Sequence, residues 1–340
     1  MSSGQIKKAL VTGASGFLAT QIILLLLERD YYVIGAVRSS AKADAWQQLH
    51  SRESQSGRLS FVVVPDMQTP GAYDDAVRDV DIIFHTASPF NFTFKDNEKD
   101  MLLPARDGAL SVLESAAKAK GVQKVIFTSS FAAVTSPHLD PRPGYTYTES
   151  DWNPVEWSEA VNSQDAHFVY LASKTFAEKA VWEFVKTRSP HFTVTSIVPP
   201  IILGKATQPF TSMADINQSS RVLHRLLDVE QMPHTPAYVS VDVKDCALCH
   251  ILAAESDKAP GKRYLTIGSS FSQAKAAQTI AKLFPEQAHR LPEPPSDPME
   301  HYSYSVARVE QDLGVQWTPF ETTIKETFQQ VLEVEKITTS

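Results

Sequence analysis

The chain has 340 residues, of which 43% are hydrophobic and 21% charged, and its formal net charge at pH 7 is -7. This length is enough for one or two domains with a large core. The acidic balance argues against nucleic acid or an anionic membrane as a partner, and no apolar run is as long as a membrane span. We therefore expect a cytoplasmic protein that binds neither nucleic acid nor membrane, and no metal site is expected.

The N-terminal region contains a glycine-rich turn between a strand and a helix. Residues 8–12 predict a short buried strand, and an apolar helix is predicted to run through Leu27. Between them the sequence Gly-Ala-Ser-Gly-Phe-Leu-Ala begins at Gly13. Gly13 can supply the tight turn, Gly16 lets the backbone approach a pyrophosphate, and Ala19 is small enough for the helix to pack on the strand. The pattern predicts a dinucleotide site with its anion at a helix N-terminus.

The residue that follows the second predicted strand indicates which dinucleotide binds. An NAD site usually has an acidic residue about 20 positions after the glycines, where it bonds the ribose 2′-hydroxyl. Here Arg38 takes that place, and Lys42 follows one helical turn later. Two cations suit a 2′-phosphate, so the sequence favours NADPH over NADH, although a surface arginine at a strand end is the simpler alternative.

Short β-branched or apolar runs recur along the first 200 residues. They predict strands at 8–12, 31–37, 59–65, 82–86, 125–129 and 192–198. Strands that alternate with helical patterns predict an α/β fold, a doubly wound parallel sheet of the Rossmann type. We expect an NADP-binding domain over 1–198, with 239–257 packing back on it. A smaller C-terminal substrate lobe is expected over 199–238 and 258–340.

Tyr170 and Lys174 are spaced by four residues in a predicted helix, which puts them on one face. A neighbouring ammonium can favour the phenolate, and lowering a phenol pKa by about three units takes roughly 4 kcal/mol. The same spacing also arises by chance on a solvated helix face. The pair becomes informative only together with the dinucleotide turn upstream.

The sequence Cys-Ala-Leu-Cys-His, which starts at Cys246, matches a c-type haem attachment motif and contains a Cys-x-x-Cys pair. The residues around it predict an amphipathic helix opened by Asp242. The chain has no further cysteine to complete a zinc site. Core cysteines are therefore expected.

Several motifs together resemble one enzyme family. They are Val-Thr-Gly-Ala-Ser-Gly-Phe-Leu-Ala from Val11, Phe-His-Thr-Ala-Ser-Pro-Phe from Phe84, Phe-Thr-Ser-Ser from Phe127, Tyr-x-x-x-Lys from Tyr170, Glu-Ser-Asp-Trp-Asn-Pro from Glu149 and Phe-Ala-Glu-Lys-Ala from Phe176. The chain resembles an extended short-chain dehydrogenase/reductase of the dihydroflavonol reductase and cinnamoyl-CoA reductase branch. Within it, the chain is most similar to the fungal NADPH-dependent methylglyoxal, aldehyde and ketone reductases.

The resemblance implies a catalytic group of Ser130, Tyr170 and Lys174. Ser130 and Tyr170 would hold the substrate carbonyl oxygen, and Tyr170 would donate a proton as hydride arrives from the nicotinamide. Lys174 would lower the phenol pKa and bond the nicotinamide ribose. One departure is visible, because Arg-Asp-Gly from Arg106 replaces the usual Asn-Gly pair. Whether Asp107 takes the role of that asparagine is left open.

The expected cofactor contacts combine the glycine turn, the cations after the second strand and the positions that the resemblance implies. Asp66 would reach the adenine and Pro199 would edge the nicotinamide. The full expected set is Thr12, Gly13, Ser15, Gly16, Phe17, Leu18, Arg38, Lys42, Asp66, Met67, Thr86, Ala87, Ser88, Ser129, Tyr170, Lys174, Pro199, Ile201 and Ile202.

Expected substrate contacts are apolar: Phe90, Phe131 and Ile201, with Phe94 and residues 211–227 further out. Each could equally be core filling. An apolar wall suits an uncharged aldehyde or ketone, aromatic or an α-dicarbonyl, reduced to an alcohol by an NADPH-dependent carbonyl reductase. Two alternatives stay open: a nucleotide-sugar epimerase or dehydratase on the same fold, and a non-catalytic NADP-binding sensor. The sequence does not indicate an oligomeric state.

Overall fold

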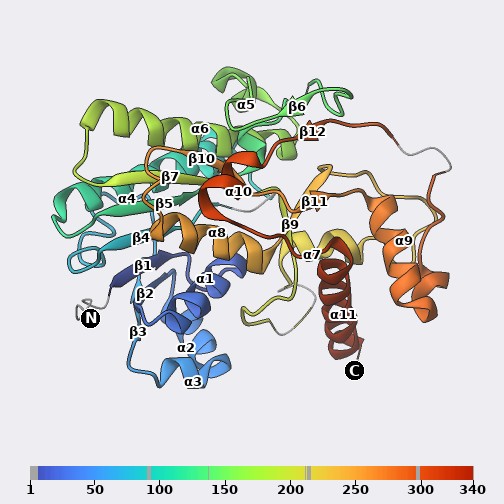
Figure 1. The fold of residues 1–340 in the computed structure, drawn as a ribbon, viewed down its shortest axis with the longest axis horizontal. Coiled ribbons are helices and arrows are strands. Elements are labelled where there is room, and N and C mark those ends of the chain that lie inside the picture. Colours follow the sequence, from blue (N-terminus) through green and yellow to red (C-terminus); the bar gives the residue numbers. More distant parts are fainter. Residues whose placement is uncertain are drawn as a thin grey trace.

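The computed structural model describes residues 7–89, 93–136, 138–210, 212, 216–295 and 299–339. Its centre is a parallel sheet of seven strands (Figure 1). In spatial order the strands are β10 (Arg263–Leu265), β7 (Thr193–Val198), β5 (Lys124–Thr128), β4 (Ile82–His85), β1 (Lys8–Thr12), β2 (Tyr32–Val37) and β3 (Leu59–Val63). The doubly wound parallel sheet expected from the sequence is confirmed. The six expected strands are all present, and β10 is a seventh that the sequence does not predict.

The strands are buried on both faces because their side chains alternate between two cores. Ala9 and Val11 of β1 belong to one core, whereas Leu10 belongs to the other. The first core is closed by α1 (Phe17–Glu28), α2 (Ser40–Leu49), α8 (Val243–Glu255) and α10 (Ala307–Leu313). The second is closed by α4 (Leu103–Lys118) and α6 (Ala166–Arg188). A helix layer on each face follows from this alternation.

The motif Cys-Ala-Leu-Cys-His lies on α8, where both cysteines are buried free thiols. Asp242 caps the helix and accepts a hydrogen bond from the Lys244 amide at 2.8 Å, as the sequence predicts. His250 Nδ1 donates to the Cys246 carbonyl at 2.7 Å, so its Nε2 accepts from the Thr128 hydroxyl at 2.9 Å. The expected core position of these cysteines is confirmed.

A third apolar cluster lies outside the central sheet. It joins α7 (Gln218–His224), α9 (Gln273–Leu283) and α11 (Phe320–Thr339), which Figure 1 shows together at one end of the molecule. A small sheet of β8 (Ile201–Leu203), β9 (Val239–Asp242) and β11 (Ser269–Ser270) lies beside them. The remaining α-helices and strands are α3 (Ser51–Ser54), α5 (Trp157–Asn162), β6 (Thr146–Tyr147) and β12 (Ser303–Tyr304), and three short non-α helical segments are η1 (Glu98–Leu102), η2 (Phe131–Ala133) and η3 (Pro285–Arg290).

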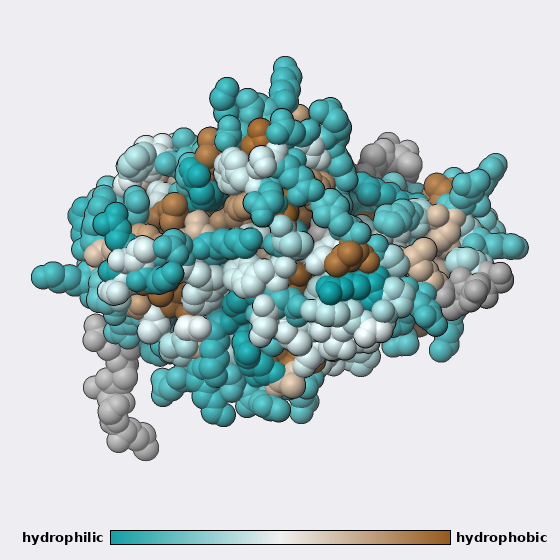
Figure 2. All heavy atoms as spheres, turned by 90° about the horizontal axis from the view of Figure 1, so that it is seen from above, coloured by the Kyte–Doolittle hydropathy of each residue, from teal (hydrophilic) through white to brown (hydrophobic). Residues whose placement is uncertain are grey.

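The surface view in Figure 2 shows hydrophilic residues over most of the visible face, with hydrophobic ones in small separate patches. Within the described ranges, no helix combines the length and the apolar composition that a membrane span requires.

We predict that Gly35→Ala destabilises the protein by about 1–3 kcal/mol, because overpacking a close-packed core costs this much. Gly35 lies in β2, where a Cβ atom would come within 2.7 Å of the Phe61 ring and 2.9 Å of the Ala14 methyl. Urea denaturation measures the change.

Gly121→Ala is the matched control, because its Cβ would meet only the Val80 carbonyl at 3.4 Å. We expect its free energy of unfolding to stay within about 0.5 kcal/mol of wild type. Equal effects of the two substitutions would contradict the packing argument.

Candidate functional site

The residues predicted to form the site gather at one edge of the central sheet. The glycine turn follows β1, Arg38 follows β2, Asp66 follows β3 by three residues, and Thr86 follows β4. Ser130 comes two residues after β5, and Pro199 directly follows β7. All seven strands are parallel, so these positions share the carboxyl edge, where ligands bind in doubly wound folds.

Hydrogen bonds join the ends of β1 and β4 closely. The Thr12 hydroxyl oxygen accepts from the amides of Thr86 and Ala87, each at 3.1 Å. Its own proton is therefore left for His85 Nδ1 at 2.9 Å, which places the imidazole proton on Nε2. Burial lowers the pKa of His85 to about 3, and the positive charge of Lys174 acts in the same direction. His85 is thus a neutral residue beneath the site.

The glycine turn has the conformation that the dinucleotide motif requires. Gly13 has φ +66°, and a Cβ there would lie 3.1 Å from the Ala87 Cα. Gly16 precedes α1, whose first turn has no acidic residue, so its free amides and dipole favour an anion. Ser15 and Phe17 are half-buried, whereas the Leu18 side chain packs in the core. A contact from Leu18 to a bound cofactor would therefore use its backbone.

Two exposed cations, Arg38 and Lys42, lie at the position that is predicted to contact the adenosine ribose. Within the described part of the chain, the side chains of Arg38 and Lys42 take part in no ion pair. Asp66 is exposed and accepts hydrogen bonds from the Gln68 amide at 2.9 Å and the Thr69 hydroxyl at 3.2 Å. These residues fit a phosphorylated ribose, because two unpaired cations are available to it.

Met67 and the Arg106-Asp107-Gly108 sequence are neighbours. A Cβ atom on residue 108 would overlap the Met67 methyl group, so any larger residue there would require the Met67 side chain to move. The Asp107 carboxylate accepts a hydrogen bond from Arg106 Nε at 2.7 Å, and both side chains are partly exposed. Asp107 is thus paired with its neighbour in sequence.

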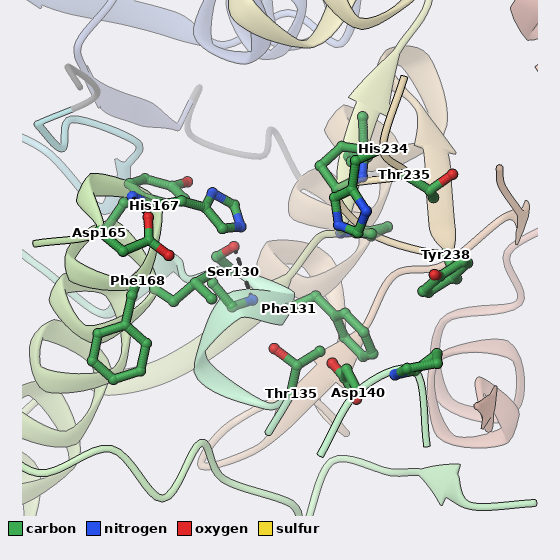
Figure 3. Close-up of a pocket in the computed structure, with 18 of the residues that line it drawn as sticks. Ser130, Phe131, Thr135, Asp140, Asp165, His167, Phe168, His234, Thr235 and Tyr238 are labelled. Carbon is green, nitrogen blue, oxygen red and sulfur yellow. Dashed lines mark hydrogen bonds between the residues drawn. The ribbon is translucent and has the colours of Figure 1, made fainter. Parts of the chain in front are cut away.

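Ser130, Tyr170 and Lys174 come together as expected. The hydroxyls of Ser130 and Tyr170 are hydrogen-bonded to each other, and Lys174 Nζ lies 5.6 Å from the centroid of the Tyr170 ring. Tyr170 and Lys174 both lie on α6, which confirms the predicted helix. Ser130 Oγ also accepts a hydrogen bond from the Ala132 amide at 3.2 Å (Figure 3).

The prediction that Lys174 lowers the pKa of the Tyr170 phenol is wrong for this structure. Burial raises the pKa of Tyr170 well above 10, and the hydrogen bond from Ser130 offsets only part of that rise. The same burial lowers the pKa of the Lys174 ammonium to about 8. Removing both groups from water disfavours both charged forms, and this outweighs their mutual attraction. Tyr170 therefore keeps its proton at neutral pH.

Ser129 points away from this group. Its hydroxyl donates to the buried Glu178 carboxylate at 2.6 Å, so that proton is not available to a cofactor. The cofactor contact expected of Ser129 is left to its backbone and stays a prediction. Pro199 is buried, and its carbonyl accepts from the Phe131 amide at 2.8 Å.

A cavity of about 1100 Å³ opens beside Ser130 and Tyr170. Figure 3 shows Asp165, His167 and Phe168 on one wall and His234, Thr235 and Tyr238 on the opposite one. Most of this lining was not predicted from the sequence. His167 could have been found from its spacing of three residues before Tyr170 on α6, because that spacing shares a face. Nothing in the sequence links the Met299 and Tyr302 segment to this place.

The expected substrate contacts have mixed outcomes. Phe131 and Ile201 line the cavity. Phe90 lies outside the described residues, as does part of the 211–227 segment, although Arg225 of that segment lines the cavity. Phe94 instead packs with the cluster that contains Met101 and Leu102. The wall also carries His167, His234 and Arg225, so it is less apolar than expected.

The parallel sheet, the glycine turn and the Ser130, Tyr170 and Lys174 group define a dinucleotide-binding protein of the extended short-chain dehydrogenase/reductase class. A family model confirms this class. Residues 10–272 match the 3-beta hydroxysteroid dehydrogenase/isomerase family, and the chain belongs to that family.

Similar proteins of known name include two fungal reductases. A ketoreductase of Aspergillus niger is 33% identical, with 96% of this chain and 98% of the relative aligned. The NADPH-dependent methylglyoxal reductase of Saccharomyces cerevisiae is 31% identical, with coverages of 96% and 98%. The crystal structure of the yeast methylglyoxal/isovaleraldehyde reductase complexed with NADPH superposes with a TM-score of 0.88 at 30% identity, covering 97% of this chain and 99% of that one.

We predict that Lys174→Met stabilises the cofactor-free protein at pH 7 by roughly 3–4 kcal/mol, since each pKa unit is worth about 1.4 kcal/mol. The folded-state pKa of about 8 lies below the ordinary lysine pKa of 10.5, which the unfolded chain keeps. The unfolded chain therefore binds more protons between these two pH values. Wild-type stability should rise from pH 8 to pH 10.5 through this group, and the variant should lose that rise. Urea titrations across this pH range measure the free energy of unfolding of both proteins. If it depends on pH equally in the variant and in wild type, the burial of the Lys174 ammonium is contradicted.

We predict that Arg38→Asp lowers kcat/KM for NADPH on the order of 10²-fold, because a charge-assisted contact is replaced by repulsion. The kcat/KM of the variant for NADH should be unchanged or higher than that of wild type. Arg78→Asp is the control, because Arg78 is exposed, pairs with Asp75 and precedes the amino end of β4, away from the site edge. An unchanged preference for NADPH in Arg38→Asp would refute the assignment.

Proposed function

We propose that this protein is an NADPH-dependent carbonyl reductase that converts an aldehyde or ketone to an alcohol. The reductase class and the NADPH dependence are confirmed by the relatives named above, at identities of 30% or more over nearly the whole chain. One observation carries the mechanism: the hydroxyl of a protonated Tyr170 meets that of Ser130 at the edge of the large cavity.

The residues at the sheet edge fit the cofactor. The Gly13 turn and the free amides of α1 would hold the pyrophosphate, and Arg38 with Lys42 would hold the 2′-phosphate. Asp66, Met67, Thr86 to Ser88 and Pro199 to Ile202 follow their strands along the same edge. When bound, NADPH supplies the hydride.

The chain's own residues hold the carbonyl and move the proton. Ser130 and Tyr170 would both donate hydrogen bonds to the carbonyl oxygen, where negative charge develops during reduction. Tyr170 then transfers its proton to that oxygen, because an alkoxide is a stronger base than a phenolate. The Lys174 ammonium would stabilise the phenolate left behind, in a site where its attraction is weakly screened. The raised pKa of Tyr170 keeps the proton in place until the oxygen becomes basic.

We propose an uncharged aldehyde or ketone as the substrate, aromatic or an α-dicarbonyl. Apolar support comes from Phe131, Phe168, Leu171 and Ile201, which line the cavity near Tyr170. A volume of about 1100 Å³ is generous for one small molecule, so a bulky substituent on the carbonyl can be accommodated.

We further propose the domain division 1–198 with 239–257, and 199–238 with 258–340, together with a cytoplasmic location. The separate apolar cluster of α7, α9 and α11 supports the smaller lobe, although β10 from that stretch joins the central sheet. The free thiols of Cys246 and Cys249 suit a reducing compartment.

We predict that Tyr170→Phe lowers kcat by about 10²- to 10⁴-fold, since general acid catalysis contributes this much. Loss of NADPH absorbance with a panel of aldehydes and diketones measures the rate. Binding of NADPH, followed by its fluorescence, should change by less than about threefold, because the ring remains. Full activity in Tyr170→Phe would refute the proposed mechanism.

A further inference from the structure

One buried carboxylate links the sheet to the helix that carries Tyr170. Glu178 lies on α6 and has no exposed surface. Its Oε2 atom accepts from the Ser129 hydroxyl at 2.6 Å, and its Oε1 atom accepts from the Ser196 hydroxyl at 2.6 Å. Arg263 of β10 binds both oxygens, through Nε at 2.8 Å and Nη2 at 3.0 Å. The carboxylate therefore has partners on β7, on β10 and at the end of β5.

Arg263 is itself fixed in place. Its Nη1 atom donates to the carbonyl oxygens of Glu149 at 2.7 Å and Asp151 at 2.9 Å. Its guanidinium carbon lies 3.7 Å from the centroid of the Trp152 ring. The planar guanidinium is held by a bidentate ion pair, two backbone carbonyls and an aromatic face, so it has little conformational freedom. It therefore fixes the orientation of Glu178.

The geometry connects this ion pair to the proposed catalytic group by two routes. Ser129 and Ser130 are consecutive, and Ser130 is extended at φ -157°, ψ 150°. Their side chains therefore point to opposite sides, Ser129 to Glu178 and Ser130 to the cavity. On α6, Tyr170 and Glu178 are eight residues apart and so lie on one face. The helix thus meets the end of β5 twice, at Ser129 with Glu178 and at Ser130 with Tyr170.

We propose that Glu178 and Arg263 are positioning residues, which set the separation of the Ser130 and Tyr170 hydroxyls through the Ser129 hydrogen bond. The proposal rests on the proposed reductase function. A buried ion pair is by itself a weak source of stability, so its net contribution does not explain this arrangement. The two contacts between α6 and the end of β5, in contrast, limit how far the helix can slide or rotate relative to the strand. A small misplacement of reacting groups is costly to rate.

Ser129→Ala and Ser196→Ala form a matched pair that tests this positioning role. Each removes one buried hydroxyl that donates to Glu178 at 2.6 Å, but only Ser129 adjoins Ser130. We expect both variants to lose thermal stability by similar amounts. We expect kcat to fall on the order of 10-fold in Ser129→Ala and by less than about twofold in Ser196→Ala. The KM for NADPH should be unchanged in both.

Arg263→Lys tests the other end of the ion pair, because lysine keeps the positive charge but cannot form the bidentate hydrogen bonds to Glu178. A lower kcat with an unchanged KM for NADPH is expected there too. Equal kcat losses in the two serine variants would overturn the proposal, as would a raised KM for NADPH with full kcat in Ser129→Ala. Wild-type kcat in Arg263→Lys would also overturn it. If the wild-type protein reduces no carbonyl compound with NADPH, the proposed function itself fails.

Discussion

The site depends on how α6 packs against the carboxyl end of β5. Tyr170 and Lys174 come from the helix, whereas Ser130 comes from the residues that follow the strand. Neither segment alone has a reactive group, because isolated serine and tyrosine hydroxyls have no special reactivity. Packing brings the two hydroxyls together and removes Tyr170 and Lys174 from water, which shifts both pKa values.

The parallel sheet makes this contact part of a larger arrangement. Every strand of the central sheet ends at the same edge, so the glycine turn, Arg38 and Ser130 face one region although they are far apart in sequence. Thr12 connects β1 to β4 at this edge, because its hydroxyl oxygen accepts hydrogen bonds from two backbone amides that follow β4. The predicted cofactor contacts and the proposed catalytic residues thus lie on one rigid sheet, while the cavity adds side chains from more distant segments.

The sheet and the core of the site could be predicted because their signals are local. Apolar runs of five to seven residues marked six strands, and a glycine turn followed by Arg38 indicated NADPH. Strand β10 has only three residues, including a buried arginine, and gave no such signal. The pKa of Tyr170 could not be predicted either, because it is set by burial, which depends on the whole fold. Met299 and Tyr302 reach the cavity through tertiary packing alone.

In the proposed reaction, hydride passes from NADPH to a carbonyl carbon while Tyr170 supplies the proton. The most direct measurement uses NADPH deuterated at C4 of the nicotinamide, with the product analysed by NMR. We expect one deuterium at the carbinol carbon and one NADPH consumed for each alcohol formed. Turnover without net consumption of NADPH, or product without deuterium from either C4 face, would contradict it.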